Sequence, residues 1–221
     1  MEKKAFIFDL NGTMIDDMQY HARAWYDILN HDLKAGLTQD EVNVQMYGKN
    51  NELLERIFGK HHFDETRMKE LSLEKERRYK QAYLPNLKLI NGLQIFLERS
   101  EQAGIPMALG SAAITFNIDF ILDNLHIRHF FKAIVSADDV TTSKPDPETF
   151  IKCAELLNVS PQNCIVFEDA PKGVEAAQNA GMDCVVLTTM HEKEEFSQYK
   201  NVIDFIEDYR SVNPAEFSNL K

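Results

Sequence analysis

Cysteine is scarce in this chain, and its scarcity argues against a disulfide framework. The three cysteines, Cys153, Cys164 and Cys184, are odd in number and lack the spacing of metal ligands. We therefore expect reduced thiols in the core of a cytoplasmic protein.

Positive charge is also in short supply. The sequence has 24 Lys and Arg against 35 Asp and Glu, which gives a net charge of −11. A surface of this sign repels nucleic acid and anionic membranes, so we expect neither as a partner. Phosphate would bind only where a local cation or a metal ion offsets the negative charge.

Long apolar runs are absent as well. No stretch approaches the roughly 20 apolar residues that cross a membrane. Residues 1–4 lead directly into a strand without the core of a signal peptide, which again predicts a cytoplasmic protein. With 221 residues, 44% of them hydrophobic, the chain is long enough for one core domain with a small insert.

The most informative stretch present is residues 5–13, Ala-Phe-Ile-Phe-Asp-Leu-Asn-Gly-Thr. Its apolar beginning predicts a buried parallel strand, and Asn11-Gly12 predicts the tight turn that ends it. Because open α/β sheets bind ligands at the carboxyl ends of their strands, we expect Asp9 to project into such a crevice. An ordinary strand followed by an acidic turn is the alternative.

Residues 15–85 have a helical pattern without a strand. Apolar residues recur at helical spacing from Met18 to Leu29, which predicts one amphipathic helix. Capping residues predict three more helices, with starts at Thr38, at Asn51, and at Asp64 or Thr66. Four helices of this kind predict a compact insert that does not belong to the sheet.

After Pro85, helices alternate with short apolar strands. Strands are expected at 107–110, 133–136, 164–167 and 184–187, with a short edge strand at 202–203. This alternation predicts an α/β fold with a doubly wound, mostly parallel sheet. We therefore divide the chain into a core of residues 1–14 and 86–221 and an insert of residues 15–85.

Polar side chains follow several of the expected strands. Asp9 follows the first strand, Ser111 the second, and Glu168-Asp169 the fourth, while Lys144 lies in a proline-rich loop. Close carboxylates repel one another unless a cation holds them, and oxygen ligands alone suggest Mg²⁺. Ser111 and Lys144 would supply a donor and a positive charge to a phosphoryl oxygen. Each residue alone has an ordinary explanation, as a helix cap or a solvated turn residue.

Four segments, residues 9–13, 109–111, 144–147 and 167–173, resemble the ordered motifs of the haloacid dehalogenase (HAD) superfamily. Residues 17–25 are similar to those of β-phosphoglucomutase-like members, and the resemblance spans nearly the whole chain. It implies a HAD Rossmann-like core with the insert as a four-helix cap domain. It also implies an enzyme, a HAD-type phosphatase or phosphomutase-like hydrolase, that acts on small phosphorylated metabolites such as sugar phosphates.

The resemblance implies that Asp9 attacks phosphorus and forms an aspartyl-phosphate, which divides the transfer into two steps. The implied catalytic residues are Asp9, Asn11, Ser111 and Lys144. The implied Mg²⁺ ligands are Asp9, the main-chain carbonyl of Asn11, and Asp169, with Glu168 nearby.

The resemblance further implies substrate binding by Asp17, His21, Asn51, Lys75, Ser111 and Ala112. Two of these have ordinary alternatives: His21 as a buried structural histidine, and Lys75 as part of the solvated face of a charged helix. Asn51 stands where the mutases have an arginine, and Ala113 and Thr115 replace their phosphate-binding Ser and Asn. These departures weaken the assignment to the mutases, which need two phosphate subsites.

Asn11 is the most consequential departure from the family. HAD phosphatases and mutases normally carry Asp two residues after the nucleophile, where it protonates the leaving oxygen and later activates the acceptor. An amide does not exchange a proton at neutral pH. Because general acid–base catalysis contributes roughly 10²–10⁴-fold, we expect reduced activity, with less reduction for a good leaving group such as an acyl phosphate.

Two other functions stay open. Asn11 would also suit a non-catalytic HAD protein that binds a phosphorylated metabolite. A dehalogenase-type hydrolase is the third reading, although Glu168-Asp169 and Lys144-Pro145 favour the phosphate branch. In each case we expect a monomer whose partner is a small molecule.

Overall fold

The computed structural model describes residues 4–218 and consists of two compact units. Met1–Asp16 and Lys88–Lys221 form one, which we call the core unit, and Asp17–Leu87 form the other, which we call the helical unit. The interpretation of the helical unit as a cap stays a prediction.

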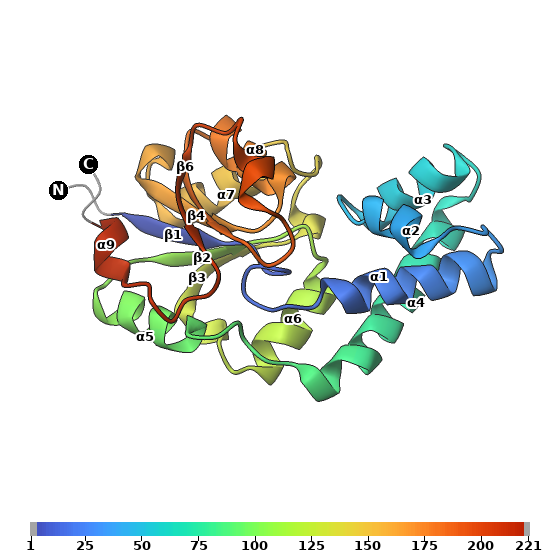
Figure 1. The fold of residues 1–221 in the computed structure, drawn as a ribbon, viewed down its shortest axis with the longest axis horizontal. Helices are drawn as coiled ribbons and strands as arrows, with labels where there is room; N and C mark the ends of the chain where they lie inside the picture. The colour runs from blue at the N-terminus through green and yellow to red at the C-terminus, as the bar shows by residue number, and fades with distance from the viewer. Residues whose placement is uncertain (1–3, 219–221) are drawn as a thin grey trace. The chain divides into compact units, whose positions relative to one another are not determined.

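The core unit is built on a six-stranded sheet in the order β3-β2-β1-β4-β5-β6 (Figure 1). Its strands are β1 (Ala5–Phe8), β2 (Met107–Gly110), β3 (Phe131–Val135), β4 (Cys164–Glu168), β5 (Asp183–Leu187) and β6 (Val202–Ile206). All neighbouring strands are parallel, so the predicted doubly wound α/β fold is confirmed.

The register of the central strands aligns their carboxyl ends. Phe8 of β1 pairs with Leu109 of β2 and with Phe167 of β4. The next residue of each strand, Asp9, Gly110 or Glu168, therefore reaches the same edge of the sheet at the same level.

Helices cover both faces of this sheet: α7 (Glu148–Leu157) and α8 (Pro171–Asn179) one face, α5 (Leu93–Gln102) and α6 (Thr115–Asn124) the other (Figure 1). Side chains of β1 alternate between the faces, as the period of two requires. Ile7 packs in the cluster of α7 and α8, whereas Phe6 and Phe8 contact the ring of Phe96 on α5. Burial on both faces explains why β1 is apolar throughout.

Shorter elements complete the core unit. They are the 3₁₀ turns Arg128–Phe130, Ala137–Asp139, Pro161–Asn163 and Lys193–Phe196, and the helix α9 (Pro214–Ser218). Cys153, Cys164 and Cys184 are buried and free, as expected of core thiols.

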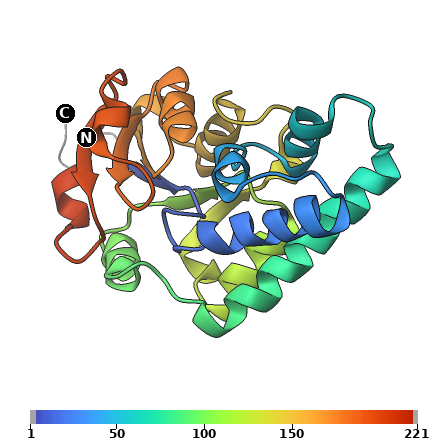
Figure 2. The ribbon, with the colours of Figure 1, turned by 45° about the vertical axis from the view of Figure 1, so that its right-hand side comes forward.

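The helical unit contains α1 (Met18–Asp27), α2 (Gln39–Val44), α3 (Asn50–Phe58) and α4 (Glu65–Tyr83), with a π-helical turn at Ile28–Asp32 and a 3₁₀ turn at Leu84–Asn86. Figure 2 shows the long helix α4 running beside α1, with which it is in contact. Its apolar core comprises Trp25, Ile28, Leu29, Val42, Leu53, Leu54 and Leu71. The predicted caps Thr38 and Asp64 are confirmed, because each side chain accepts an amide of the first helical turn.

Three predicted boundaries are wrong. Asn51 does not cap α3: Lys49 takes that place, and its amide donates to Glu52. Strand β3 ends before Ser136, because this hydroxyl instead accepts the Asp138 amide at the start of a 3₁₀ turn. Strand β6 is longer than predicted, since exposed Asp204 interrupts its apolar pattern at the sheet edge.

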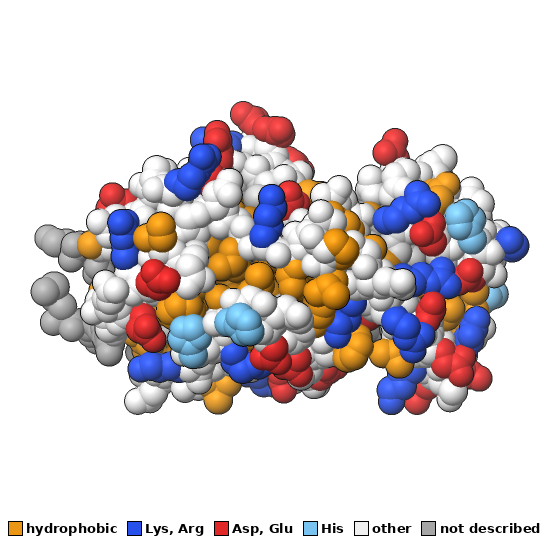
Figure 3. Space-filling view, turned by 90° about the horizontal axis from the view of Figure 1, so that it is seen from below, with side chains coloured by type: hydrophobic (Ala, Val, Ile, Leu, Met, Phe, Trp, Pro, Cys, Tyr) orange, Lys and Arg blue, Asp and Glu red, His pale blue; other side chains and the backbone are white. Residues whose placement is uncertain are grey.

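The surface has a mixed charge. On the face drawn in Figure 3, acidic and basic side chains of the described residues are interspersed, with no extended area of one sign. Within residues 4–218 no helix has the length and apolar character needed to cross a membrane.

Candidate active site

Three charged side chains meet at the carboxyl edge of the sheet. The Lys144 ammonium lies 2.7 Å from Asp9 Oδ1 and 2.9 Å from Glu168 Oε1, and it donates to the carbonyl of Gly110 at 3.2 Å. The acids reach this edge because β1 and β4 are neighbours, and Lys144 reaches it from the loop that precedes α7. The structure thus brings together three predicted site residues that lie far apart in the sequence.

The electrostatics of this cluster favour the charged form of Lys144 and disfavour the charged forms of Asp9 and Asp169. Burial raises the pKa of Asp9 to about 7 from an ordinary 3.8, against the attraction of Lys144. Burial raises the pKa of Asp169 as well, and repulsion from Glu168 and Asp9 adds to the rise. Burial lowers the pKa of Lys144, but attraction to Asp9 and Glu168 outweighs burial and raises it overall, so this side chain is charged at neutral pH.

Asp169 packs directly against the turn that follows Asp9. The Thr13 hydroxyl donates to Asp169 Oδ1 at 3.1 Å. Gly12 has φ +79°, and a Cβ there would lie 2.1 Å from Asp169 Oδ2, so only glycine fits. The turn is closed from within, because the Gly12 amide donates to the carbonyl of Ile15 at 2.8 Å. The packing therefore requires glycine at position 12, and Thr13 fixes Asp169 beside this turn.

Both oxygens of Glu168 are used by the protein itself. Oε1 accepts from Lys144, and Oε2 accepts the amides of Asp169 and Ala170 at 2.8 Å each. A Cβ on Gly173 would lie 1.6 Å from Oε1, so the first turn of α8 leaves room for this carboxylate only because residue 173 is glycine. These contacts suit Glu168 to holding Lys144 and the start of α8. Its place among the metal ligands stays a prediction.

Ser111 lies buried immediately after β2. Its amide donates to the carbonyl of Val135 at 3.0 Å, and its Oγ accepts the amide of Ala113 at 3.0 Å. It does not cap α6, which begins after Ile114, so the ordinary explanation as a helix cap is wrong. As an acceptor in this bond, the hydroxyl keeps its own proton for donation. Ala112 follows it and is half-buried.

Asn11 is half-buried at the start of the turn, where its backbone forms a bridge with Ile15. The catalytic, substrate and metal roles of Asn11, Ser111 and Ala112 stay predictions.

Three of the predicted substrate ligands form a buried network inside the helical unit. Lys75 Nζ lies 2.6 Å from His21 Nδ1 and 3.0 Å from Glu76 Oε1, and His21 Nε2 lies 3.2 Å from Asp17 Oδ2. The Tyr79 hydroxyl donates to the same oxygen of Asp17 at 2.5 Å. Lys75 is only 4% exposed, so its alternative placement on a solvated helix face is wrong. Burial lowers its pKa, although Glu76 and Asp17 oppose that shift.

The network has members that sequence reasoning missed. Asn50 donates to Glu76 Oε1 at 2.6 Å, whereas the predicted residue Asn51 is exposed on α3 and takes no part in these contacts. The i to i+4 spacing of Lys75 and Tyr79 along α4 was the available signal, because such residues share one face of a helix.

The residues at the ends of β1 and β4 offer oxygen donors that fit a divalent cation. No group of three or more His, Cys, Asp and Glu side chains among residues 4–218 has the arrangement of a metal site. The predicted set combines the carboxylates of Asp9 and Asp169 with the main-chain carbonyl of Asn11, with the Glu168 carboxylate nearby, and it stays a prediction. Repulsion from Glu168 raises the pKa of both Asp9 and Asp169, Asp9 raises the pKa of Asp169 further, and a cation would relieve this repulsion. Oxygen donors of this type suit Mg²⁺.

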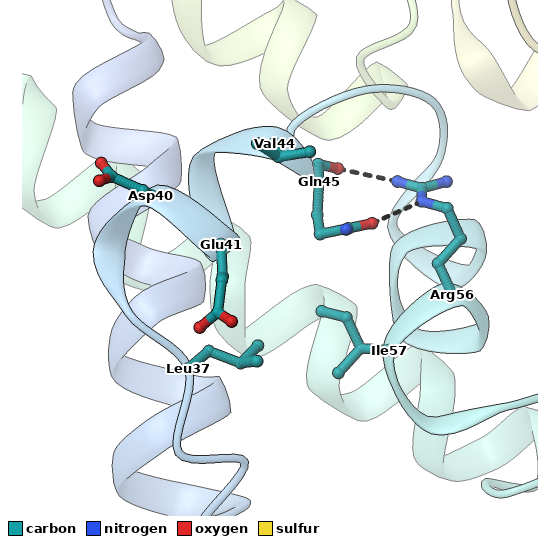
Figure 4. A pocket seen from close by; sticks show the side chains of 7 residues that line it. All are labelled: Leu37, Asp40, Glu41, Val44, Gln45, Arg56 and Ile57. Atoms are coloured by element: carbon teal, nitrogen blue, oxygen red, sulfur yellow. Dashed lines mark hydrogen bonds between the residues drawn. The ribbon is translucent and has the colours of Figure 1, made fainter.

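A pocket of about 450 Å³ lies elsewhere, in the helical unit between α2 and α3 (Figure 4). Arg56 faces it but is engaged by Gln45 Oε1 at 3.0 Å and by the carbonyls of Gln45 and Tyr47 at 2.8 Å each. None of the predicted site residues lines this pocket. Its single arginine serves the end of α2, and we do not assign the active site there.

Comparison with known proteins points to one family. The model of a family described as "Haloacid dehalogenase-like hydrolase" matches residues 6–187. Fructose-1-phosphate phosphatase YqaB of Escherichia coli (strain K12) is 32% identical over 180 residues, which cover 81% of this chain and 93% of that protein. Beta-phosphoglucomutase of Bacillus subtilis (strain 168) is 33% identical over 189 residues, which cover 82% of each chain.

The fold leads to the same group. The crystal structure of beta-phosphoglucomutase from Clostridium difficile superimposes with a TM-score of 0.83 at 27% identity, covering 97% of this chain and 95% of that chain.

Proposed function

We propose a function for this chain from its family: it belongs to the haloacid dehalogenase-like hydrolases, in the β-phosphoglucomutase-like subgroup. It is therefore an enzyme of the phosphatase and phosphomutase type. We propose that it transfers phosphoryl groups from small phosphorylated metabolites through Asp9. The observation that carries this proposal is the ion pair of Asp9 and Lys144 at the end of the central strand, beside Glu168. Two relatives are named for sugar phosphates, which supports that substrate class.

In the proposed first step, a carboxylate oxygen of Asp9 attacks phosphorus and the bond to the leaving oxygen breaks. Lys144 stabilises the negative charge that spreads over the phosphoryl oxygens, and its contact with Glu168 keeps it in position. Ser111 donates a hydrogen bond to one of these oxygens. Water then attacks the phosphorus of the aspartyl-phosphate, the bond from phosphorus to the Asp9 oxygen breaks, and inorganic phosphate leaves as the Asp9 carboxylate is regenerated.

A divalent cation fits the same edge. We propose Mg²⁺ held by Asp9, Asp169 and the main-chain carbonyl of Asn11, where it would neutralise charge on the transferred group. The raised pKa of Asp9 supports this, because the nucleophile must be ionised and a cation favours the ionised form.

Asn11 limits the proposed reaction. Its side-chain amide donates a hydrogen bond but supplies no proton to the leaving oxygen. We therefore expect slow turnover of sugar phosphates and faster turnover of an acyl phosphate. The same residue favours the second candidate function, a protein that binds a phosphorylated metabolite without turnover.

The helical unit supports a phosphatase over a mutase. Lys75, the cation proposed by resemblance for a substrate phosphate, is held by His21 and Glu76, which both belong to that unit. Direct substrate contact would require it to leave both partners. For Asp17, His21 and Lys75 the contacts favour a structural role, and substrate contacts by Asn51 and Ala112 remain predictions.

The test is phosphate release from a panel of sugar phosphates and one acyl phosphate, with and without Mg²⁺, by the wild type, Asp9→Ala and Asn11→Asp. Release by the wild type that requires Mg²⁺ and Asp9 supports a phosphatase. Release by Asn11→Asp alone, together with thermal stabilisation of the wild type by the same compounds, supports the binding protein. Activity that survives EDTA contradicts both.

A further inference from the structure

A threonine that follows β5 contacts the turn next to the proposed nucleophile. Thr189 follows β5, two residues after that strand ends, and its hydroxyl donates to the carbonyl of Gly12 at 2.6 Å. The two residues are 177 positions apart in the sequence. Neither the sequence motifs nor the family resemblance points to this residue.

The position of the Gly12 carbonyl influences the orientation of the residues on either side of it in the turn. The amide of Gly12 is fixed inside the turn by the carbonyl of Ile15, so Thr189 holds this residue at its other end. The peptide bond that Thr189 grips leads directly to Thr13, whose hydroxyl donates to Asp169 Oδ1 at 3.1 Å. Because a peptide unit is planar, fixing its oxygen also fixes the orientation of the Thr13 backbone.

The backbone next to Thr189 is fixed by a hydrogen bond between strands β5 and β6. The preceding Thr188 donates its amide to the carbonyl of Ile206, which ties the end of β5 to the end of β6 at 3.0 Å. Thr189 itself is half-buried. The contact therefore links the turn at residues 10–13 to the paired ends of two strands.

We propose that Thr189 is a positioning residue that holds this turn in the geometry needed for cation binding. It acts on Asp169 through Thr13, and on the carbonyl of Asn11 through the adjoining Gly12. The inference rests on the proposed function, in which Asp9, Asp169 and the carbonyl of Asn11 hold the cation. It adds a residue that would not touch substrate, cation or reacting atoms.

Substitutions at Thr189 separate its hydroxyl from its bulk. Thr189→Val keeps the shape and removes the donor, whereas Thr189→Ser keeps the donor. Thr189→Ala and Thr189→Ser form a second pair that differs only by the hydroxyl, for use if the valine variant does not fold. Thr188→Val is the matched control, because its hydroxyl faces Ile206 and not the turn.

The measurement is the affinity of the metal-free full chain for Mn²⁺, followed by calorimetry or by electron paramagnetic resonance. Loss of a group that orients metal ligands typically weakens metal binding 10- to 100-fold, so Thr189→Val should raise the Kd for Mn²⁺ about tenfold. Thr189→Ser and Thr188→Val should stay close to the wild type. Any loss of turnover in Thr189→Val should be recovered at high Mg²⁺, which a general loss of structure would not allow.

Wild-type affinity in Thr189→Val would overturn the inference, as would equal weakening by Thr189→Val and Thr189→Ser. Asp169→Asn separates this failure from that of the proposed function. If Asp169→Asn leaves Mn²⁺ binding intact, the proposed cation set is wrong. If Asp169→Asn abolishes binding and Thr189→Val does not alter it, only the role of Thr189 fails.

Discussion

Removing the charge of Asp9 should stabilise the metal-free protein at neutral and alkaline pH. Burial raises the pKa of Asp9 to about 7 from an ordinary 3.8, despite the opposing attraction of Lys144. Between these two values the folded protein keeps a proton on Asp9 that the unfolded chain releases. Raising the pH through this window therefore lowers the free energy of unfolding.

The size of the effect follows from the shift. About three pKa units at about 1.36 kcal/mol each give about 4 kcal/mol for the whole window. Roughly two of these units lie above pH 5, so the wild type should lose about 3 kcal/mol from this group between about pH 5 and pH 8. Asp9→Asn has no charge to bury and should not show this loss.

Urea unfolding in EDTA at several pH values measures the difference between the wild type and Asp9→Asn. Asp204→Asn, which removes an exposed carboxylate on β6, is the control and should keep the pH dependence of the wild type. Mg²⁺ should stabilise the wild type at pH 8 more than it stabilises Asp9→Asn. Parallel pH profiles of the wild type and Asp9→Asn would refute the reasoning.

Three other substitutions give separate tests. Asn11→Asp should raise the turnover of sugar phosphates by about 10²–10⁴-fold and that of an acyl phosphate by less, and an equal gain on both would contradict a proton-transfer role. Gly173→Ala should displace Glu168 from Lys144 and lower activity together with stability, by about 1–3 kcal/mol in urea unfolding. Lys75→Met should cost about 3–5 kcal/mol, because buried Glu76 would lose its ammonium partner although Asn50 still donates to it, and adding Glu76→Gln should recover part of the loss. A loss close to zero for Lys75→Met would show that this pair is not buried in solution.

The core of this fold and the meeting of its strand-end residues were predictable from the sequence, because parallel strands leave little freedom. Once residues 5–8 are identified as a buried strand, topology places Asp9 at the same edge as the two acids at the end of β4. The glycines beside those acids were also visible, although only the structure shows that a Cβ on Gly173 would collide with Glu168.

The buried network of the helical unit could not be predicted from the sequence. Lys75 belongs to a strongly charged helix, but it contacts His21 of α1, which in turn contacts Asp17. Such pairings are set by tertiary packing, which overrides local pattern. Thr189 was out of reach for the same reason, since a single hydroxyl in a loop acquires its meaning only from the carbonyl that it meets.

The Asn11-Gly12 sequence affects how the activity of the wild type and of Asn11→Asp is compared. Asn-Gly is prone to deamidation, which would convert residue 11 to aspartate. In this structure the Gly12 amide, which must attack the Asn11 side chain in that reaction, is hydrogen-bonded to the carbonyl of Ile15. We expect slow deamidation in the folded protein, and intact mass measured before each assay verifies it.

The most direct test of the central role of Asp9 is a search for a phosphoryl group on its side chain. The wild type would be mixed with an acyl phosphate and Mg²⁺, quenched in acid and digested, and its peptides analysed by mass spectrometry. We predict a phosphoryl adduct on the peptide that contains Asp9, and none on the same peptide of Asp9→Asn. Phosphate release without an adduct in the wild type, and with undiminished rate in Asp9→Asn, would contradict the account.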